Sequence, residues 1–287
     1  MLKILGFYVF CKLLVLCVLG WGVGELGENV LSLWGNTENR MMNQLLKNLN
    51  ERQQEAVQAT EGSVRIIAGA GSGKTRVIAH RYAYLVNVLG VDPGNILCMT
   101  FTNKAAQEMK HRISRLVDSG LVTDYVCTIH GFCVKFLRKE IHRLGYPKTF
   151  TILDDEDKKA MVKRIMEAMN IDRKKSTVNK HLAHIGKTKG KMRMDYVAQF
   201  MLPHSKAEPK ADMQFFCNYL KEQLRLFAVH FDDLMYFTLY ILHNFPEVRK
   251  AWQSELNYLQ IDEVQDCDGD EWELFSILSG GLGNLCV

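Results

Sequence analysis

The sequence has eight cysteines among its 287 residues but no Cys-x-x-Cys pair. Disulfide frameworks and zinc sites are built from cysteines at short, repeated spacings, so this lack argues against both. Several of the cysteines fall in apolar, strand-like segments, which indicates the reduced structural thiols of a cytoplasmic protein. Disordered proteins contain few hydrophobic residues, whereas 47% of the residues here are hydrophobic and 24% are charged. We therefore expect a folded protein of roughly two domains.

Acidic side chains are the minority in one region and basic side chains are scarce in another, although the formal net charge is only +4. Residues 128–225 contain 21 basic but only 11 acidic side chains, whereas residues 226–287 contain 11 acidic and only 2 basic ones. The basic region predicts a polyanionic partner, and the acidic region predicts a metal or regulatory role. A solvated basic helical face is the alternative for the first region.

Residues 1–41 do not fit a soluble domain. Ile4–Gly24 is almost wholly apolar and is long enough to span a membrane, but Lys12 near its centre costs ~2.5–3.5 kcal/mol on insertion scales. A signal peptide is a second interpretation, although no small-x-small cleavage site follows. A third interpretation, which we favour, is that translation begins at Met41 or Met42 and that the upstream segment is not native. The sequence leaves all three open.

A glycine-rich loop lies between a predicted strand at Val64–Ala68 and a predicted helix at Arg76–Leu89. Such a strand–loop–helix unit is typical of a phosphate-binding loop, because glycines let backbone N–H groups approach phosphates closely. In this arrangement Lys74 reaches the β- and γ-phosphates, and the Thr75 hydroxyl holds Mg²⁺. A merely flexible glycine turn is the alternative, which the flanking elements disfavour. The loop consists of Ala68, Gly69, Ala70, Gly71, Ser72, Gly73, Lys74 and Thr75.

Further strand–helix units predict an α/β fold, in which a parallel sheet is covered by helices on both faces. We expect buried strands at Ile96–Thr100, Tyr125–Thr128 and Leu256–Ile261. In such sheets ligands bind beyond the carboxyl ends of the strands. Polar loops at Gly71, Thr102 and His130 lie at those ends.

The pattern changes between Asp154 and Leu226, where the chain is basic, rich in helical periodicity and poor in strand signals. Lys187–Arg193 is its densest cationic stretch. We interpret residues 154–226 as a helical subdomain inserted into a core formed by residues 42–153 and 227–287.

Paired carboxylates follow the predicted strand at Leu256–Ile261, in the motif Asp262-Glu263-Val264-Gln265-Asp266. In a nucleotide hydrolase Asp262 would bind Mg²⁺ through water, and Glu263 would orient or deprotonate the attacking water. An exposed acidic turn is the usual alternative. The phosphate-binding loop upstream favours the catalytic interpretation.

Together these motifs resemble the UvrD/PcrA/Rep-type DNA helicases of superfamily 1, over the stretch from about Leu49 to Val287. The family fold is a RecA-like core, and its activity is ATP hydrolysis coupled to translocation on single-stranded DNA, with Mg²⁺. The resemblance is carried by Leu49-Asn50 with Gln53, the loop from Ala68 through Arg76, Thr100–Ala106, Thr128–His130, Phe231–Leu234 and Asp262–Asp266.

The resemblance implies roles for individual residues. Gln53 would hydrogen-bond the adenine edge, and Arg76 would stack on the adenine ring. Phe101 would stack on a DNA base, an interaction worth ~1–3 kcal/mol that tolerates any sequence; a core aromatic is the alternative. The residues that would line the DNA track with it are Thr102, Asn103, Lys104, Thr128 and His130.

The resemblance also implies partners. Single-stranded DNA and single/double-strand junctions are expected, with the basic insertion gripping the duplex in a salt-sensitive way. Membrane association is expected only if residues 4–24 are genuine. A second RecA-like core is expected in the full-length protein, because this sequence ends where the next buried strand should begin. That core would supply the arginines that contribute ~10³–10⁵ in rate in related enzymes, so we expect residual hydrolysis at most.

Three rival functions remain at this point. The chain could be a non-catalytic nucleic-acid-binding P-loop module, or the N-terminal part of a helicase–nuclease subunit. A small-molecule kinase would use the same loop, but it would not need Thr100–Lys104 or the Asp262–Asp266 motif. The polarity of translocation and the biological pathway do not follow from the sequence.

Overall fold

The computed structural model describes residues 41–69, 71–117, 122–172, 174–202, 213–280 and 283–287. Of residues 1–41 only Met41 is described, so the apolar stretch Ile4–Gly24 lies outside the described residues, and so does Ala70 of the loop. In the part of the chain that is described, no helix is long and apolar enough to cross a membrane.

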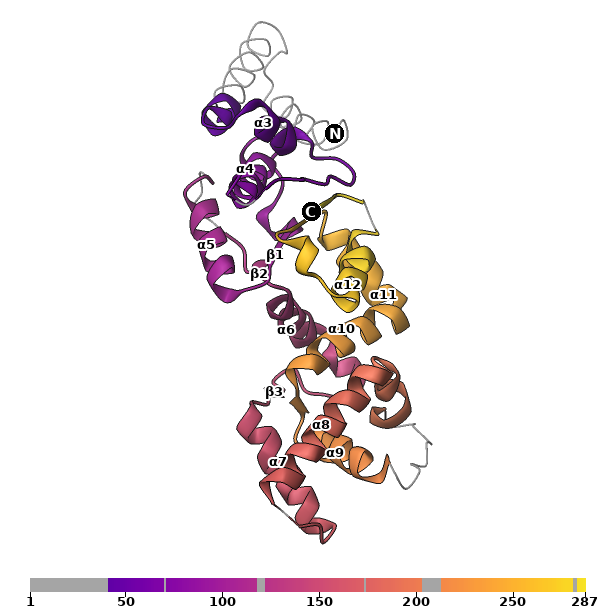
Figure 1. Cartoon of the computed structure of the whole chain (residues 1–287). Helices are drawn as coiled ribbons and strands as arrows, with labels where there is room; N and C mark the ends of the chain where they lie inside the picture. Colours follow the sequence, from indigo (N-terminus) through magenta and orange to yellow (C-terminus); the bar gives the residue numbers. More distant parts are fainter. Residues whose placement is uncertain (1–40, 70, 118–121, 173, 203–212, 281–282) are drawn as a thin grey trace, which may run out of the picture.

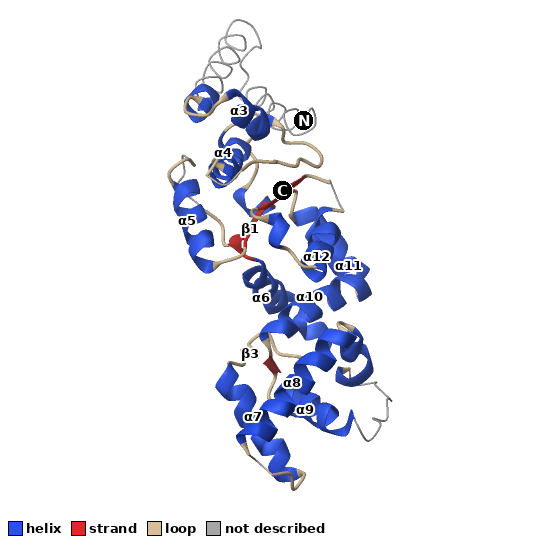
Figure 2. Cartoon of the chain, viewed as in Figure 1, coloured by secondary structure: helices blue, strands red, loops and turns tan. Residues whose placement is uncertain are grey.

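A four-stranded parallel sheet with the order β2-β1-β5-β6 forms the centre of the upper half of the molecule (Figure 2). The strands are β1 (Ile96–Thr100), β2 (Val126–Thr128), β5 (Tyr258–Ile261) and β6 (Leu285–Cys286). All five residues of β1 and all four of β5 are buried, as expected of strands covered on both faces. The α/β fold predicted from the sequence is confirmed.

Alternate side chains of β1 enter two different hydrophobic layers. Ile96 and Cys98 pack with α4 (Lys74–Asn87) and α5 (Asn103–Ser114) on one face. Leu97 and Met99 pack with α6 (Ile129–Glu140) and α12 (Gly269–Ser279) on the other face. This period of two is the expected consequence of strand geometry, and it places helices on both sides of the sheet.

The structure corrects the prediction of a buried strand at Val64–Ala68. This segment is extended, but it makes only one parallel bridge, from Val64 to Cys286. The N–H groups of Val64 and Ile66 donate to carbonyls of Leu285 and Val287. Ile67 is 84% exposed. The segment lies at the edge of the sheet beyond the two-residue strand β6, so it is covered far less than its apolar sequence predicted.

Side chains cap the starts of two helices. Asn50 caps α3 (Glu51–Gln58) through a capping box with Gln53. Asp154 caps α7 (Asp155–Ala168) in the same way. Short turns complete this part of the chain: η1 (Pro93–Asn95), η2 (Ile141–Leu144) and η5 (Val264–Asp266).

The basic segment between residues 154 and 226 forms α7, α8 (Lys175–Met192), the π-helical turn η3 (Val197–Met201) and α9 (Gln214–Arg225). These helices lie at the end of the molecule opposite α3 and α4 (Figure 1). The chain enters and leaves them through a small parallel pair, β3 (Thr151–Ile152) and β4 (Ala228–Val229). The proposed domain boundaries of 154 and 226 fall just inside this pair and stay a prediction.

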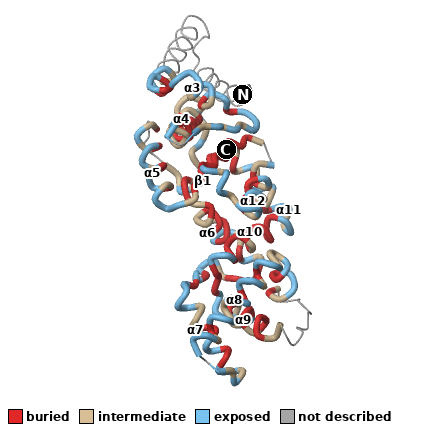
Figure 3. Tube along the Cα trace, viewed as in Figure 1, coloured by how far each residue is buried: buried red, intermediate tan, exposed pale blue. Residues whose placement is uncertain are grey.

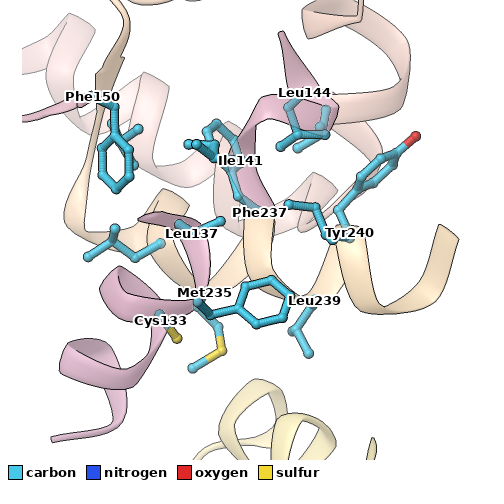
Figure 4. Packing of buried hydrophobic residues seen from close by; sticks show 14 of the residues in the cluster. Cys133, Leu137, Ile141, Leu144, Phe150, Met235, Phe237, Leu239 and Tyr240 are labelled. Carbon is cyan, nitrogen blue, oxygen red and sulfur yellow. The ribbon is translucent and has the colours of Figure 1, made fainter. Parts of the chain in front are cut away.

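The described residues of the segment 154–226 share their hydrophobic core with the sheet domain. One buried cluster runs from the sheet through α6 and α10 (Phe231–Asn244) into α7–α9 (Figure 3). In Figure 4, Leu137 of α6 and Ile141 of η2 lie with Phe237 of α10 inside this cluster. After α10 the chain continues through α11 (Pro246–Glu255) to β5. Packing therefore couples the insertion to the core along α10.

A buried polar network crosses the same junction. The Lys189 ammonium of α8 donates to both carboxylate oxygens of Asp233 at 2.6 and 2.8 Å, and to the Gln223 side chain at 2.9 Å. The Asp233 carboxylate also accepts from the Tyr196 hydroxyl, the Gln223 amide and the His230 backbone N–H. Lys189 and Asp233 are 2% and 0% exposed, so the network is sealed from water.

The cationic stretch Lys187–Arg193 is thus only partly a surface feature. Lys189 points inward, and Arg193 forms ion pairs with Asp270 and Glu273 of α12. The sequence predicted that the basic side chains of this stretch contact a polyanionic partner, but Lys189 and Arg193 instead join α8 to the core. The prediction missed these pairs because local composition does not reveal which acidic residues lie nearby in the folded chain.

Candidate nucleotide-binding site

Glycines form the turn that opens α4. Gly73 is the N-cap residue at φ +92°, and no side chain caps the helix. Gly71 also has a positive φ of +74°, a conformation that glycine adopts without steric cost. The first N–H groups of a helix lack intrahelical partners and carry partial positive charge. The start of α4 therefore has the properties of a phosphate site.

Side chains from outside and inside the loop hold its shape. The Ser72 hydroxyl donates to the Gly69 carbonyl at 2.7 Å, and the Gln53 amide donates to the Ser72 carbonyl at 3.1 Å. Lys74 donates its ammonium to the Ala68 carbonyl at 3.2 Å. Since this acceptor is a neutral carbonyl, the positive charge of Lys74 is not neutralised by it.

A cavity of about 380 Å³ lies between α3 and the loop. It is in the size range of small-molecule sites. Of the predicted cofactor-binding residues it brings together Gln53, Ala68, Ser72 and Lys74. Arg76 does not line it, because its guanidinium donates to the Asn48 carbonyl at 2.7 Å.

The predicted metal residues meet although 187 positions separate them. The Thr75 hydroxyl donates to Asp262 Oδ2 at 3.0 Å. Asp262 Oδ1 is buried and has no hydrogen-bond partner among the described residues. Hydroxyl and carboxylate oxygens are the ligands that Mg²⁺ prefers, and the free Oδ1 leaves an acceptor for the ion or its water. These residues therefore fit a magnesium ion.

Electrostatics around Asp262 suit a cation. Burial raises the pKa of this carboxyl, the nearby Glu263 charge raises it further, and the hydrogen bond from Thr75 opposes both. A bound cation would relieve the cost of keeping this carboxylate ionised.

Glu263 is exposed and has a left-handed backbone, with φ +58°. This conformation costs a non-glycine residue ~1–2 kcal/mol, and such strain tends to occur at functional sites. The Gln265 amide donates to Glu263 Oε2 at 2.6 Å. The sharp turn thus separates two adjacent carboxylates, with Asp262 directed inward and Glu263 in contact with solvent.

The predicted DNA residues follow β1 and β2 at their carboxyl ends. Thr102 caps α5 by accepting from the Ala105 N–H, and Thr128 caps α6 by accepting from the Gly131 N–H. Asn103 and Lys104 are exposed in the first turn of α5. The two threonines therefore have structural roles as caps, while their neighbours are open to a ligand.

An aromatic pair lies beside these loops. The rings of His130 and Phe231 stack with centroids 4.0 Å apart and planes 13° apart, and Phe231 is 51% exposed. Burial lowers the pKa of His130, an effect that the charges of Asp232 and Asp268 oppose. Phe101 is partly buried against the core. The sequence identifies Phe231 only as part of the motif Phe231–Leu234. It does not reveal that the ring is exposed beside His130.

A parallel α/β sheet, a glycine-rich loop opening a helix, and a strand-end aspartate bound to that helix define a RecA-like P-loop core. The sequence profile of the UvrD/REP helicase N-terminal domain matches residues 49–287, so the chain belongs to this family.

Curated relatives agree with this assignment. The chain is similar to the ATP-dependent DNA helicase PcrA of Staphylococcus aureus, with 38% identity over 246 residues, which is 86% of this chain and 33% of that protein. PcrA of Staphylococcus epidermidis is also 38% identical over 246 residues, covering 34% of its length. The chain thus spans about a third of the length of these relatives.

Proposed function

We propose that this chain is the ATP-binding core of a DNA helicase, which binds Mg·ATP at the loop and single-stranded DNA across the carboxyl ends of β1 and β2. The observation that carries the proposal is the contact between Thr75 and Asp262, which unites the loop with the acidic motif. The names of the relatives, all ATP-dependent DNA helicases, support the same activity.

In this proposal each group has a defined task. The N–H groups at the start of α4 and the Lys74 ammonium bind the phosphates, while Gln53 contacts the base. Thr75 and Asp262 hold Mg²⁺, which supplies charge neutralisation to the phosphates when bound. Glu263, exposed at the end of β5, orients the attacking water and accepts its proton.

DNA binding uses the loops next to the nucleotide site. Lys104 and Asn103 contact the backbone, and Phe101 and the Phe231–His130 pair offer faces to bases. Stacking contributes ~1–3 kcal/mol per base without sequence preference, and phosphate contacts make the affinity fall with salt. The insertion, residues 154–226, would contact duplex DNA with the basic side chains that are not used in internal ion pairs.

Hydrolysis is expected to be weak in the 287-residue chain. The resemblance assigns the arginines that stabilise γ-phosphate charge to a second RecA-like core, and such arginines contribute ~10³–10⁵ in rate. A non-catalytic nucleic-acid-binding module is therefore a fair alternative description of this chain alone, and turnover separates the two.

The first test is nucleotide binding by the whole chain, measured with a fluorescent ATP analogue and Mg²⁺. Lys74→Ala should weaken binding about 10- to 100-fold, because a hydrogen bond to a charged group contributes ~1.5–3 kcal/mol. Lys47→Ala is the matched control, since Lys47 is exposed and lies outside the loop. Equal affinity in the two variants, or no binding by the wild-type chain, would rule out this nucleotide site.

The second readout in the same experiment is phosphate release with and without single-stranded DNA. Near-background turnover in wild-type and Lys74→Ala proteins, with salt-sensitive DNA binding in both, is the expected result. Strong DNA-stimulated turnover that Lys74→Ala abolishes would instead mean that an arginine of this chain, or of a second copy, reaches the γ-phosphate.

A further inference from the structure

Arg81 is a buried cation that the mechanism above does not use. It lies on α4, two turns beyond Lys74, and only 1% of it is exposed. Charged side chains are almost never fully buried unless they are paired. Among the described residues, the acceptors of Arg81 are all backbone carbonyls: Ala56 at 3.0 Å, Thr60 at 3.2 Å, and Ala59.

These carbonyls mark the C-terminal end of α3. Ala59 is the C-cap residue of this helix, and Thr60 follows it. The last carbonyls of a helix have no intrahelical partners and carry partial negative charge, so a guanidinium satisfies them both geometrically and electrostatically. Arg81 therefore attaches the end of α3 to α4 by its planar fork of donors.

The other end of α3 carries Gln53, whose amide reaches the Ser72 carbonyl of the loop at 3.1 Å. Between the two attachments, Val57 of α3 is fully buried in a small cluster with Val77 of α4. An eight-residue helix is too short to be stable alone and depends on such tertiary contacts. Arg81 and Gln53 thus fix α3 at opposite ends along one side of the 380 Å³ cavity.

We propose that Arg81 is a positioning residue for base recognition: it holds α3 so that the Gln53 amide faces the base, and thereby gives the site its preference for adenine over guanine nucleotides. The inference rests on the proposed function, because it requires Gln53 to contact the base. An amide offers one donor and one acceptor, which match adenine N7 and N6–H₂, whereas guanine presents two acceptors at N7 and O6. Selectivity therefore depends on the placement of one amide group.

The test compares the dissociation constants of ATP, GTP and inorganic tripolyphosphate, each with Mg²⁺, for the whole chain. Arg81→Lys keeps the charge but loses the fork of donors. We expect it to lower the selectivity for ATP over GTP about 10-fold, while the affinity for tripolyphosphate changes less than about 2-fold. Arg115→Lys, the same substitution at an exposed arginine, should leave all three constants unchanged. Arg81→Gln replaces Arg81→Lys if the latter unfolds at the assay temperature, with the same expected result.

A second substitution shows whether Arg81 acts through Gln53. In a Gln53→Ala background, Arg81→Lys should cause no further change in the ATP/GTP ratio. The inference is overturned if Arg81→Lys leaves the ATP/GTP affinity ratio unchanged, or if it lowers this ratio equally in the Gln53→Ala background. Either result leaves the nucleotide site itself intact. A wild-type chain that binds neither ATP nor tripolyphosphate overturns the proposed function and the inference together.

Discussion

Lys189→Met is expected to destabilise the protein by about 3–5 kcal/mol, because it leaves the Asp233 carboxylate buried without a cation. Asp233 is fully buried, and Lys189 donates to both of its oxygens. The remaining donors, from Tyr196, Gln223 and the His230 backbone, are neutral and cannot balance its charge. Urea unfolding of the whole chain measures the loss.

Two further variants separate the ion pair from other effects of substitution. Lys187→Met, on the same helix but exposed, should change stability by less than about 0.5 kcal/mol. The double variant Lys189→Met with Asp233→Leu should recover part of the loss, since neither charge is then buried alone. If Lys189→Met and Lys187→Met unfold at the same urea concentration, the buried pair does not hold the insertion to the core.

The same pair predicts a loss of stability in acid. Burial would raise the pKa of Asp233, but Lys189 and His230 outweigh it and lower the pKa from 3.8 to about 2. Between these values the unfolded chain binds more protons than the folded one, so stability falls as the pH falls. The contribution is complete above pH 3.8 and is lost as the pH passes through about 2. Unfolding by the wild type should therefore depend on pH in this window more steeply than unfolding by the double variant, and equal slopes would refute the ionised pair.

The sheet could be predicted where burial follows from an uninterrupted apolar run, as in Ile96–Thr100. The same reasoning failed at Val64–Ala68, because an apolar run does not reveal whether a strand has neighbours on both sides. It also failed at Lys189, whose burial depends on Asp233, 44 positions away. Composition assigned that lysine to the surface, and only tertiary structure identifies its partner.

In the candidate site, the local motifs were predictable because their chemistry depends on short spacings. The meeting of Thr75 with Asp262 followed from the rule that strand ends share one edge of a parallel sheet. The role of Arg81 did not follow, because its acceptors are backbone carbonyls, which any sequence provides. The stacking of Phe231 on His130 joins two helix starts whose proximity no local pattern encodes.

Asp262→Asn is expected to have opposite effects on the metal-free protein and on magnesium-dependent nucleotide binding. Burial raises the pKa of Asp262, so ionisation of this carboxyl costs the folded state more than the unfolded state. Its Oδ1 atom also lacks a partner among the described residues. A neutral amide of the same shape removes the buried charge and can still accept from Thr75. The variant should therefore be more stable than the wild type by about 1 kcal/mol in the presence of a chelator.

Magnesium dependence should change in the other direction. A carboxylate that holds a metal through water typically contributes 10- to 100-fold to its affinity, so Asp262→Asn should reduce the Mg²⁺-dependent gain in ATP affinity by about that factor. Asp266→Asn is the control, because Asp266 belongs to the same motif but is exposed. Thermal unfolding with a chelator and ATP titrations with and without Mg²⁺ measure the two effects. A variant that is less stable than the wild type and keeps its magnesium dependence would mean that Asp262 serves the fold. The expected pair of results would mean that the chain keeps an unfavourable buried charge because the metal requires it.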